Sequence, residues 1–168
     1  MQQNQKASIT GIGSYLPSKV LTNYDLEKMV DTSDDWIIQR TGIKERRIVE
    51  DGQITSDLAT YASLRAMEDA GVSPGDLDMI ITSTITPDHI FPSTSCYIQQ
   101  KIGASRASAF DILAACAGFI YALSVGESFV NSGAMKTVLV VGAECLSKIT
   151  DYTDRTTCIL FGDGAGAV

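Results

Sequence analysis

The sequence predicts an α/β protein with a largely parallel sheet. Two runs, 78–84 (DMIITST) and 137–143 (TVLVVGA), have the continuous apolar character of strands that are covered on both faces. Segments with helical periodicity separate them, as parallel strands with right-handed crossovers require. The chain has 168 residues, of which 45% are apolar and 20% charged, enough for one domain with a sizeable core.

The first third of the chain predicts two strands and two short helices. Asn23 can cap the first helix, and either Thr32 or Ser33 can cap the second. Gly42 is placed to stop the second helix, because glycine readily adopts the left-handed conformation found at helix ends. These elements are expected as a strand at 7–13, helices at 23–29 and from 32 or 33 to 40, and a strand at 43–49.

The clearest helix lies between residues 56 and 70. Ser56 is a plausible N-cap, Gly71 ends the periodic segment, and apolar residues recur between them at every fourth position. This stripe consists of Leu58, Ala62, Ala66 and Ala70. Further along, the sequence predicts a helix near 94–102, a strand at 107–113, a helix from about 116 to 131, a strand at 156–161 (TTCILF) and another strand starting at the final AGAV.

Net charge and hydropathy argue against a nucleic-acid-binding, membrane-spanning or secreted protein. A net charge of -7 argues against a nucleic-acid partner, since phosphate binding needs a basic face. The one basic cluster, Lys44, Arg46 and Arg47, is interrupted by Glu45 and is expected to be a solvated strand edge or an ion-pairing surface. No apolar run approaches the ~18 residues of a membrane span, and the amino terminus does not resemble a secretory signal. We therefore expect a cytoplasmic protein with no membrane partner.

The four cysteines, at positions 96, 116, 145 and 158, match no zinc pattern and are expected to be free thiols. Cys116 differs from the others because it stands in FDILAACAGF, where a strand passes to a helix. Small neighbours allow a tight turn and let a substrate approach the sulfur. At a helix start, free N–H groups and the helix dipole favour a thiolate and can stabilise an oxyanion. The alternative is an ordinary packed core cysteine.

Two other features invite a functional interpretation, which we reject. His89, the only histidine, lies on a Pro-flanked loop 27 residues before Cys116, so we expect a surface or interface residue rather than the base that a cysteine nucleophile often needs. The segment 162–168 (GDGAGAV) lacks the strand–loop–helix context of a dinucleotide loop. A tight glycine turn between packed strands is the better interpretation.

Five fragments resemble one known family in the correct order. DILAACAGF resembles the nucleophile motif of the β-ketoacyl-acyl-carrier-protein synthase III family, in the thiolase superfamily. The other four resemble its opening strand, coenzyme A segment, acyl-pocket loop and midpoint motif. They are GIGSYLP, TSDDWIIQRTGIKERR, TPDHIFPSTS and DRTTCILFGDGAGAV.

The resemblance implies a role for each matching residue. Cys116 would take an acyl group from acetyl-CoA or another short acyl-CoA, which is a substrate; no cofactor or metal would be permanently bound. Trp36 would stack on the adenine with Arg155 on its other face. Thr32 and Arg40 would lie nearby, as an aromatic ring and guanidinium groups suit a nucleotide. Phe91 would cross a homodimer interface to wall the partner's acyl pocket.

The same resemblance implies a two-step reaction and an incomplete chain. After acylation, malonyl-acyl-carrier protein would decarboxylate and condense with the acyl group, assisted by a histidine and an asparagine beyond residue 168. The apolar ending after GDGAGA also suggests a piece of a longer protein, since natural termini usually fray into polar residues. Residues 1–168 would form one amino-terminal half-domain, unable to complete the condensation alone.

The implied fold is the first α-β-α half of a thiolase-like fold, with a five-stranded mixed sheet. In the family the helix at 116–131 is buried between two such halves, so an apolar surface is expected to lie bare here. Three alternatives stay open: a related acyltransferase of secondary metabolism, a non-catalytic scaffold, and a cysteine hydrolase. Intact Cys116 and Trp36 argue against the scaffold, and the hydrolase needs a base that this chain does not supply.

Overall fold

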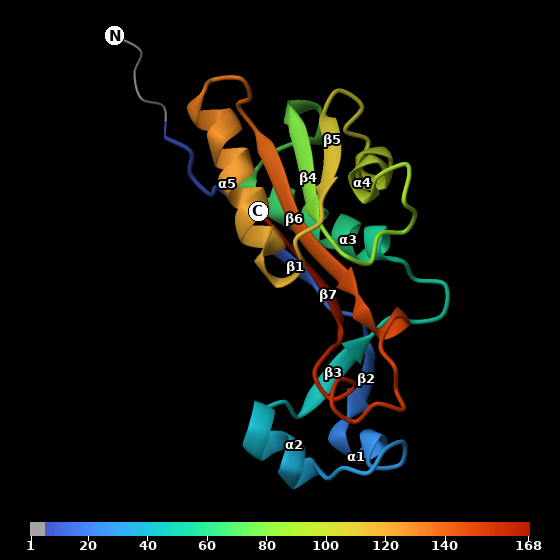
Figure 1. Ribbon diagram of the computed structural model, residues 1–168. Coiled ribbons are helices and arrows are strands. Elements are labelled where there is room, and N and C mark those ends of the chain that lie inside the picture. The colour runs from blue at the N-terminus through green and yellow to red at the C-terminus, as the bar shows by residue number, and fades with distance from the viewer. Residues whose placement is uncertain (1–5) are drawn as a thin grey trace.

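The computed structural model describes residues 6–168 and has a five-stranded main sheet with a smaller two-stranded sheet at one end (Figure 1). The strands are β1 (Gly13–Tyr15), β2 (Lys19–Thr22), β3 (Glu45–Ile48), β4 (Met79–Ser83), β5 (Ser108–Ile112), β6 (Val138–Cys145) and β7 (Asp163–Ala167). The helices are α1 (Asn23–Leu26), α2 (Asp34–Thr41), α3 (Thr55–Ala70), α4 (Thr94–Ile102) and α5 (Gly118–Asn131), with 3₁₀ turns η1 (Pro74–Asp76), η2 (Ala115–Ala117) and η3 (Leu146–Lys148).

The main sheet has the order β1-β7-β6-β4-β5 and is mixed. β4 is parallel to both β5 and β6, whereas β7 is antiparallel to β6 and to β1. Successive residues of β4 serve different layers: Ile80 belongs to the core under α3 and α4, and Ile81 to the core under α5. This two-residue alternation gives the α-β-α layering, with helices on both faces.

The smaller sheet, β2 with β3, carries α1 and α2 at the lower end of the molecule (Figure 1). Its own core consists of Leu26, Ile37, Cys158 and Ile159. The last two come from the segment between β6 and β7, so this distant part of the chain packs directly onto α1 and α2.

Most predicted boundaries are confirmed to within two residues, and the caps explain the differences. Ser33 caps α2 through the N–H of Trp36, and Gly42 ends the helix at φ 72°. Helix α1 begins at Asn23 because Thr22, not Asn23, is its cap. Helix α3 begins at Thr55 rather than after Ser56, since the carboxylate of Asp57 accepts the N–H of Ile54.

The expected strand at 7–13 is only partly confirmed. Regular pairing begins at Gly13, opposite Ala167 of β7, and residues 7–12 have no strand assignment. The paired residues of the two strands are 13–15 of β1 and 165–167 of β7. Gly13 lies so close to α3 that an added Cβ would stand 2.2 Å from the carbonyl oxygen of Ala62.

The predicted strand at 156–161 is wrong. Residues 151–160 form a series of turns, in which the Asp151 carboxylate accepts the N–H of Thr153 and the Asp154 carboxylate accepts that of Thr156. Such local bonds satisfy the backbone and compete with a sheet ladder. The strand predicted to start at the final AGAV is confirmed, but it begins earlier, at Asp163, so the tight glycine turn expected for 162–168 is wrong.

The basic cluster at 44–47 is not uniformly solvated, which corrects the prediction for Arg46. Its side chain is 4% exposed, donates to the carbonyl of Ile159 through Nε, and bonds the side chain of Asn23. Lys44 and Arg47 behave as expected: Lys44 is exposed, and Arg47 forms an ion pair of 3.1 Å with Glu45. Arg46 thus ties the small sheet to the 151–161 segment.

Candidate active site

Cys116 lies in η2, between the end of β5 and the start of α5, and its side chain is exposed. This corrects the expected position, since the cysteine precedes α5 rather than occupying its first turn. Ala115 has φ 47°, a conformation that costs a non-glycine residue energy and recurs at functional turns. Gly118 allows the tight fit that follows, because an added Cβ would stand 1.9 Å from the hydroxyl oxygen of Ser83.

The cysteine opens onto a cavity of about 530 Å³. Its walls come from the η2 turn, the loop after β4, the end of β6 and the segment leading to β7. The apolar lining residues are Ile85, Leu146, Ile149 and Phe161, and the polar ones are Glu144, Thr150, Asp151 and Thr157. A mostly apolar recess beside a reachable thiol is suited to a short acyl chain.

A second cluster gathers around Trp36 on α2. The guanidinium carbon of Arg40 lies 4.2 Å from the centroid of the indole, and that of Arg155 lies 5.8 Å away. Trp36 is half-buried against the core of Leu26 and Ile37. The ring is therefore held partly by packing and has two guanidinium groups close to it.

Arg155 is held in place by Asp31. Its Nη1 donates to the Asp31 carbonyl at 2.9 Å and to the Asp31 carboxylate at 3.3 Å. Both side chains are more than half exposed, so this ion pair contributes little to stability and can be exchanged for another anion.

Thr32, the fourth predicted nucleotide residue, carries a buried hydroxyl with no hydrogen-bond partner among residues 6–168. A buried polar atom is normally paired, and an unpaired one calls for an explanation such as an unseen ligand. The residue lies one position before Ser33, the cap of α2, and so sits beside the helix that carries Trp36 and Arg40.

One segment connects the cysteine cavity with the tryptophan cluster. Asp151 and Thr157 line the cavity, and Arg155, which lies between them in sequence, reaches Trp36. The structure therefore brings Trp36, Arg40 and Arg155 together directly and relates them to Cys116 through residues 151–157. The sequence placed these residues in different motifs and could not show that connection.

The loop between β4 and α4 carries the remaining predicted residues. Phe91 is 87% exposed and its neighbour Ile90 is 100% exposed. His89 is exposed, stacks on Tyr97 with ring centroids 5.6 Å apart, and is not among the lining residues of the cysteine cavity. Its prediction as a surface residue is confirmed, whereas the role of Phe91 across a dimer stays a prediction.

Sequence reasoning missed Glu144, which lines the cavity near the end of β6. Its carboxylate accepts the N–H groups of Ile85 at 2.9 Å and Thr86 at 3.1 Å, and also two threonine hydroxyls of the same loop. The available signal was an acidic residue directly after the apolar run 137–143, where a charge must find partners. Glu144 fixes the loop that contributes Ile85 to the wall of the cavity.

Two of the other cysteines are buried, unlike the exposed Cys116. Cys145 and Cys158 are fully buried, and burial raises the pKa of each thiol. Cys158 packs beside Arg46 among turns, so its expected place within a strand is wrong. Neither thiol resembles a nucleophile, since a raised pKa keeps sulfur protonated.

A five-stranded mixed sheet between helical layers, with an exposed cysteine between a strand and a helix, defines this protein as one with a thiolase-like fold. A crystal structure of 3-oxoacyl-acyl-carrier-protein synthase III from Aquifex aeolicus superposes with a TM-score of 0.93 at 57% identity, over 95% of this chain and 52% of that one. The priming β-ketosynthase of the R1128 polyketide pathway superposes with a TM-score of 0.94 at 39% identity, over 99% of this chain and 51% of that one.

Comparison of sequences identifies the family more specifically than comparison of folds. The profile of the 3-oxoacyl-acyl-carrier-protein synthase III family matches residues 110–168. The β-ketoacyl-acyl-carrier-protein synthase III of Caldanaerobacter subterraneus is 63% identical over 161 residues, 96% of this chain and 49% of that protein. The enzyme of the same name from Xanthomonas campestris is 62% identical over 168 residues, 100% of this chain and 52% of that protein. The chain belongs to the β-ketoacyl-acyl-carrier-protein synthase III family and spans about half the length of these relatives.

Proposed function

We propose that this chain is the acyl-accepting part of a condensing enzyme that initiates fatty-acid synthesis. Cys116 takes the acyl group from a short acyl-CoA, such as acetyl-CoA. The observation that carries the proposal is the exposed thiol in a strained turn, opening onto an apolar cavity whose wall continues into the segment bearing Arg155. The names of the relatives support the same activity.

The first step is a thioester exchange. The Cys116 thiolate attacks the carbonyl carbon of the acyl-CoA, a new sulfur–carbon bond forms, and the carbonyl oxygen becomes an oxyanion. The oxyanion collapses, the bond to the coenzyme A sulfur breaks, and coenzyme A leaves as a thiolate that takes a proton from water. Backbone N–H groups at the η2 turn and the start of α5 are the donors that can stabilise the oxyanion.

The Trp36 cluster is the proposed nucleotide site. An adenine between Trp36 and Arg155 needs two stacking separations of about 3.5 Å, whereas the guanidinium carbon of Arg155 now lies 5.8 Å from the indole centroid. Arg155 would therefore move outward by about 1 Å, exchanging its exposed pairing with Asp31 for a contact with the nucleotide. The unpaired Thr32 hydroxyl and Arg40 are the further groups available to it.

The second step is proposed for the whole protein. Malonyl-acyl-carrier protein would lose carbon dioxide, and the resulting carbanion would attack the acyl thioester on Cys116. The histidine and asparagine that stabilise the developing enolate are proposed to lie beyond residue 168, so residues 1–168 alone would acylate without condensing. We also propose a cytoplasmic homodimer, for which the exposed Ile90 and Phe91 provide a candidate contact.

Intact mass spectrometry after incubation with acetyl-CoA tests the first step. One acetyl adduct is expected, which Cys116→Ala abolishes and the matched variant Cys96→Ala retains, because Cys96 does not line the cavity. To separate inactivity from incompleteness, the assay is repeated with the remaining half of a relative supplied as a second chain. A folded two-chain sample that forms no adduct contradicts the proposal and favours a scaffold.

A related acyltransferase of secondary metabolism is the second candidate. It is favoured by the 39% identity to a polyketide priming β-ketosynthase, but the 63% identity to a β-ketoacyl-acyl-carrier-protein synthase III is higher. Primer preference distinguishes them: acetyl-CoA as the best substrate supports the fatty-acid role, and a preference for another primer supports the alternative.

A further inference from the structure

The side chains that line the Cys116 cavity have no hydrogen-bond donor to spare among residues 6–168. The hydroxyl of Thr150 donates to the carbonyl of Leu146 at 2.8 Å, and that of Thr157 donates to the carboxylate of Asp154 at 2.8 Å. Apart from the Cys116 thiol, the remaining lining side chains are apolar or acidic. A polar acyl chain in this cavity would therefore meet acceptors but no free side-chain donor.

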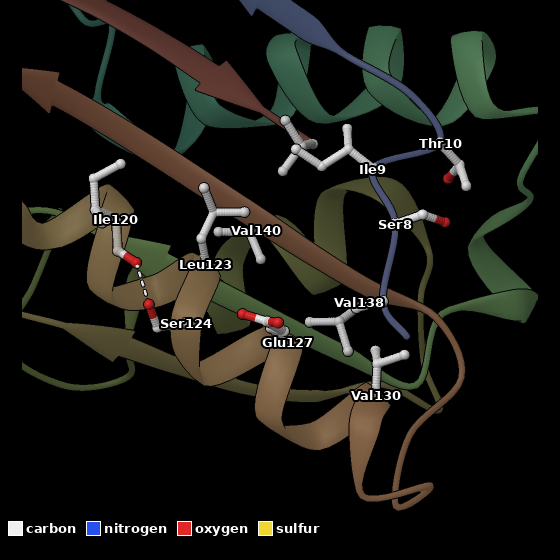
Figure 2. A pocket seen from close by; sticks show the side chains of 13 residues that line it. Ser8, Ile9, Thr10, Ile120, Leu123, Ser124, Glu127, Val130, Val138 and Val140 are labelled. Carbon is white, nitrogen blue, oxygen red and sulfur yellow. Dashed lines mark hydrogen bonds between the residues drawn. The ribbon is translucent and has the colours of Figure 1, made fainter. Parts of the chain in front are cut away.

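A hydroxyl on α5 is occupied in the same local way. Ser124 donates to the carbonyl of Ile120 at 3.1 Å, beside a second cavity of about 330 Å³ on the α5 side of the main sheet (Figure 2). This second cavity has a mostly apolar lining with one charged residue, Glu127, and it contains no cysteine. It offers no acyl acceptor, so the choice of acyl group depends on the cavity beside Cys116.

The charged side chains of the Cys116 cavity are two carboxylates, Glu144 and Asp151. Asp151 accepts the N–H of Thr153 at 2.8 Å and the hydroxyl of the same residue at 2.7 Å. These two bonds from Thr153 lower the pKa of Asp151, so this side chain is negatively charged at neutral pH. Neither carboxylate forms an ion pair within the described part of the chain. The wall at Asp151 therefore carries an unpaired negative charge.

The size of the cavity brings any acyl group within range of this charge. A volume of about 530 Å³ corresponds to a sphere about 10 Å across, and the Debye length at physiological ionic strength is about 8 Å. A carboxylate on the acyl chain would be repelled by the charge of Asp151. It would also lose water without gaining a side-chain donor, which is unfavourable for a charged group. An uncharged acyl chain of the same size incurs neither cost.

The two carboxylates differ in how far their charge is already compensated. The oxygens of Glu144 accept four hydrogen bonds from the 84–86 loop, two from N–H groups and two from hydroxyls. Asp151 accepts bonds from Thr153 alone. Because donors that surround a carboxylate offset its charge, Asp151 is expected to act more strongly than Glu144 on a second anion in the cavity.

We propose that Asp151 is a specificity-determining residue, through which the Cys116 cavity accepts short uncharged acyl groups and rejects acyl groups that end in a carboxylate. This inference rests on the proposed function, since it requires Cys116 to accept an acyl group from acyl-CoA. Specificity of this kind comes from an unfavourable contact with the wrong substrate rather than from an added contact with the right one. It would keep a malonyl group from acylating Cys116 in place of an acetyl group.

Isovaleryl-CoA and malonyl-CoA are the matched probes, because two methyl groups of the first replace the two carboxylate oxygens of the second. Both carry the same nucleotide, so the ratio of their acylation rates reports the acyl group alone. Intact mass spectrometry over time measures both rates on the 168-residue chain with the remaining half of a relative supplied as a second chain. An acetyl adduct from decarboxylation is counted with the malonyl adduct. Isovaleryl-CoA should acylate Cys116 at least about tenfold faster, from repulsion and loss of hydration together.

Raising the salt concentration tests the electrostatic origin of the ratio on the unaltered chain. Salt screens the charge of an exposed side chain, so the ratio should fall as salt is added. Because this measurement needs no substitution, failure of a variant to fold would not prevent a decision.

Two variants assign the effect to Asp151. Asp151→Asn removes the charge at almost constant size and should lower the ratio about threefold, as expected for one exposed charge. Asp76→Asn is the matched control, since Asp76 accepts the N–H and the hydroxyl of Ser73 in the same way but lies in η1, before β4, and does not line the cavity. It should leave the ratio unchanged.

The outcomes separate this inference from the proposed function. Equal rates for the two donors, a ratio that salt does not change, or a ratio that a folded Asp151→Asn does not change overturns the inference and leaves the proposed function standing. No adduct from either donor overturns both.

Discussion

Replacing Glu144 tests whether one carboxylate holds the 84–86 loop, which forms part of the wall of the Cys116 cavity. Glu144→Gln keeps the size of the side chain and one carbonyl oxygen, but places an NH₂ group against donors of the 84–86 loop. Glu144→Ala removes every acceptor, and leaves the N–H of Ile85 without its 2.9 Å partner. The N–H of Thr86 retains a second acceptor, the hydroxyl of Thr84 at 3.1 Å.

The magnitude follows from these contacts. Hydrogen bonds to a charged acceptor contribute about 1.5–3 kcal/mol each, and an unpaired buried donor costs about 1–3 kcal/mol. Since the bonds share one acceptor and are not additive, we expect Glu144→Gln to lower the free energy of unfolding by about 1–2 kcal/mol and Glu144→Ala by about 2–4 kcal/mol. Acylation of Cys116 should fall with both, because Ile85 and Glu144 line its cavity.

Urea unfolding and the acetyl-CoA mass assay measure the two effects. The control is Glu68→Gln, since Glu68 is an exposed residue of α3 whose side chain makes no hydrogen bond among residues 6–168. It should change the free energy of unfolding by less than about 0.5 kcal/mol. If Glu144→Ala unfolds at the same urea concentration as the unchanged chain, the carboxylate does not hold the loop.

Three further predictions concern other parts of the molecule. Iodoacetamide should alkylate Cys116 in the native state but leave Cys145 and Cys158 unmodified until urea is added. Those two thiols are buried, and burial raises their pKa. Peptide mapping that finds either of them labelled in the native state would refute this prediction. The hydroxyl of Thr22 lowers the pKa of Asp25 from 3.8 to about 2, so the stabilisation from this α1 cap should be complete above about pH 4 and disappear as the pH falls through about 2. A carboxyl NMR titration that places Asp25 at its ordinary value would contradict the cap. Gly13→Ala should cost more than about 2 kcal/mol in thermal or urea unfolding, since the new methyl group would meet the backbone of α3 at 2.2 Å, and an unchanged midpoint would show that the contact is not tight.

The layered fold could be predicted because its signals are local. The apolar runs of β4 and β6 and the four-residue stripe of α3 each depend on a short stretch of sequence. The main failure is the segment 156–161. TTCILF has the residue pattern of a strand, but the carboxylates of Asp151 and Asp154 accept backbone N–H groups and hold this part of the chain in turns.

The residues of the candidate site could be predicted only where the signal lay in a short stretch of sequence. Cys116 could be identified from its small neighbours and its place between a strand and a helix, and resemblance supplied Thr32, Trp36, Arg40 and Arg155. The sequence could not show that Cys116 lies in a 3₁₀ turn before α5, because the positive φ of Ala115 is a property of the folded turn. Nor could it pair Glu144 with a loop 58 residues earlier in the chain.

The exposed apolar surface expected on α5 is present in part. Ile120 is 60% exposed and Tyr121 is 55% exposed, whereas Ala122 is fully buried against the sheet. The helix thus has one packed face and one apolar outer face, which a mean hydropathy alone could not separate.

Acylation rates with two donors test the central claim most directly. The account predicts that acetyl-CoA acylates Cys116 at least about tenfold faster at limiting concentration than acetyl-pantetheine, which lacks the nucleotide, because stacking on Trp36 contributes about 1–3 kcal/mol. Trp36→Ala should remove this preference. Equal rates for the two donors in the unchanged chain, or an acetyl group mapped to a cysteine other than Cys116, would contradict it.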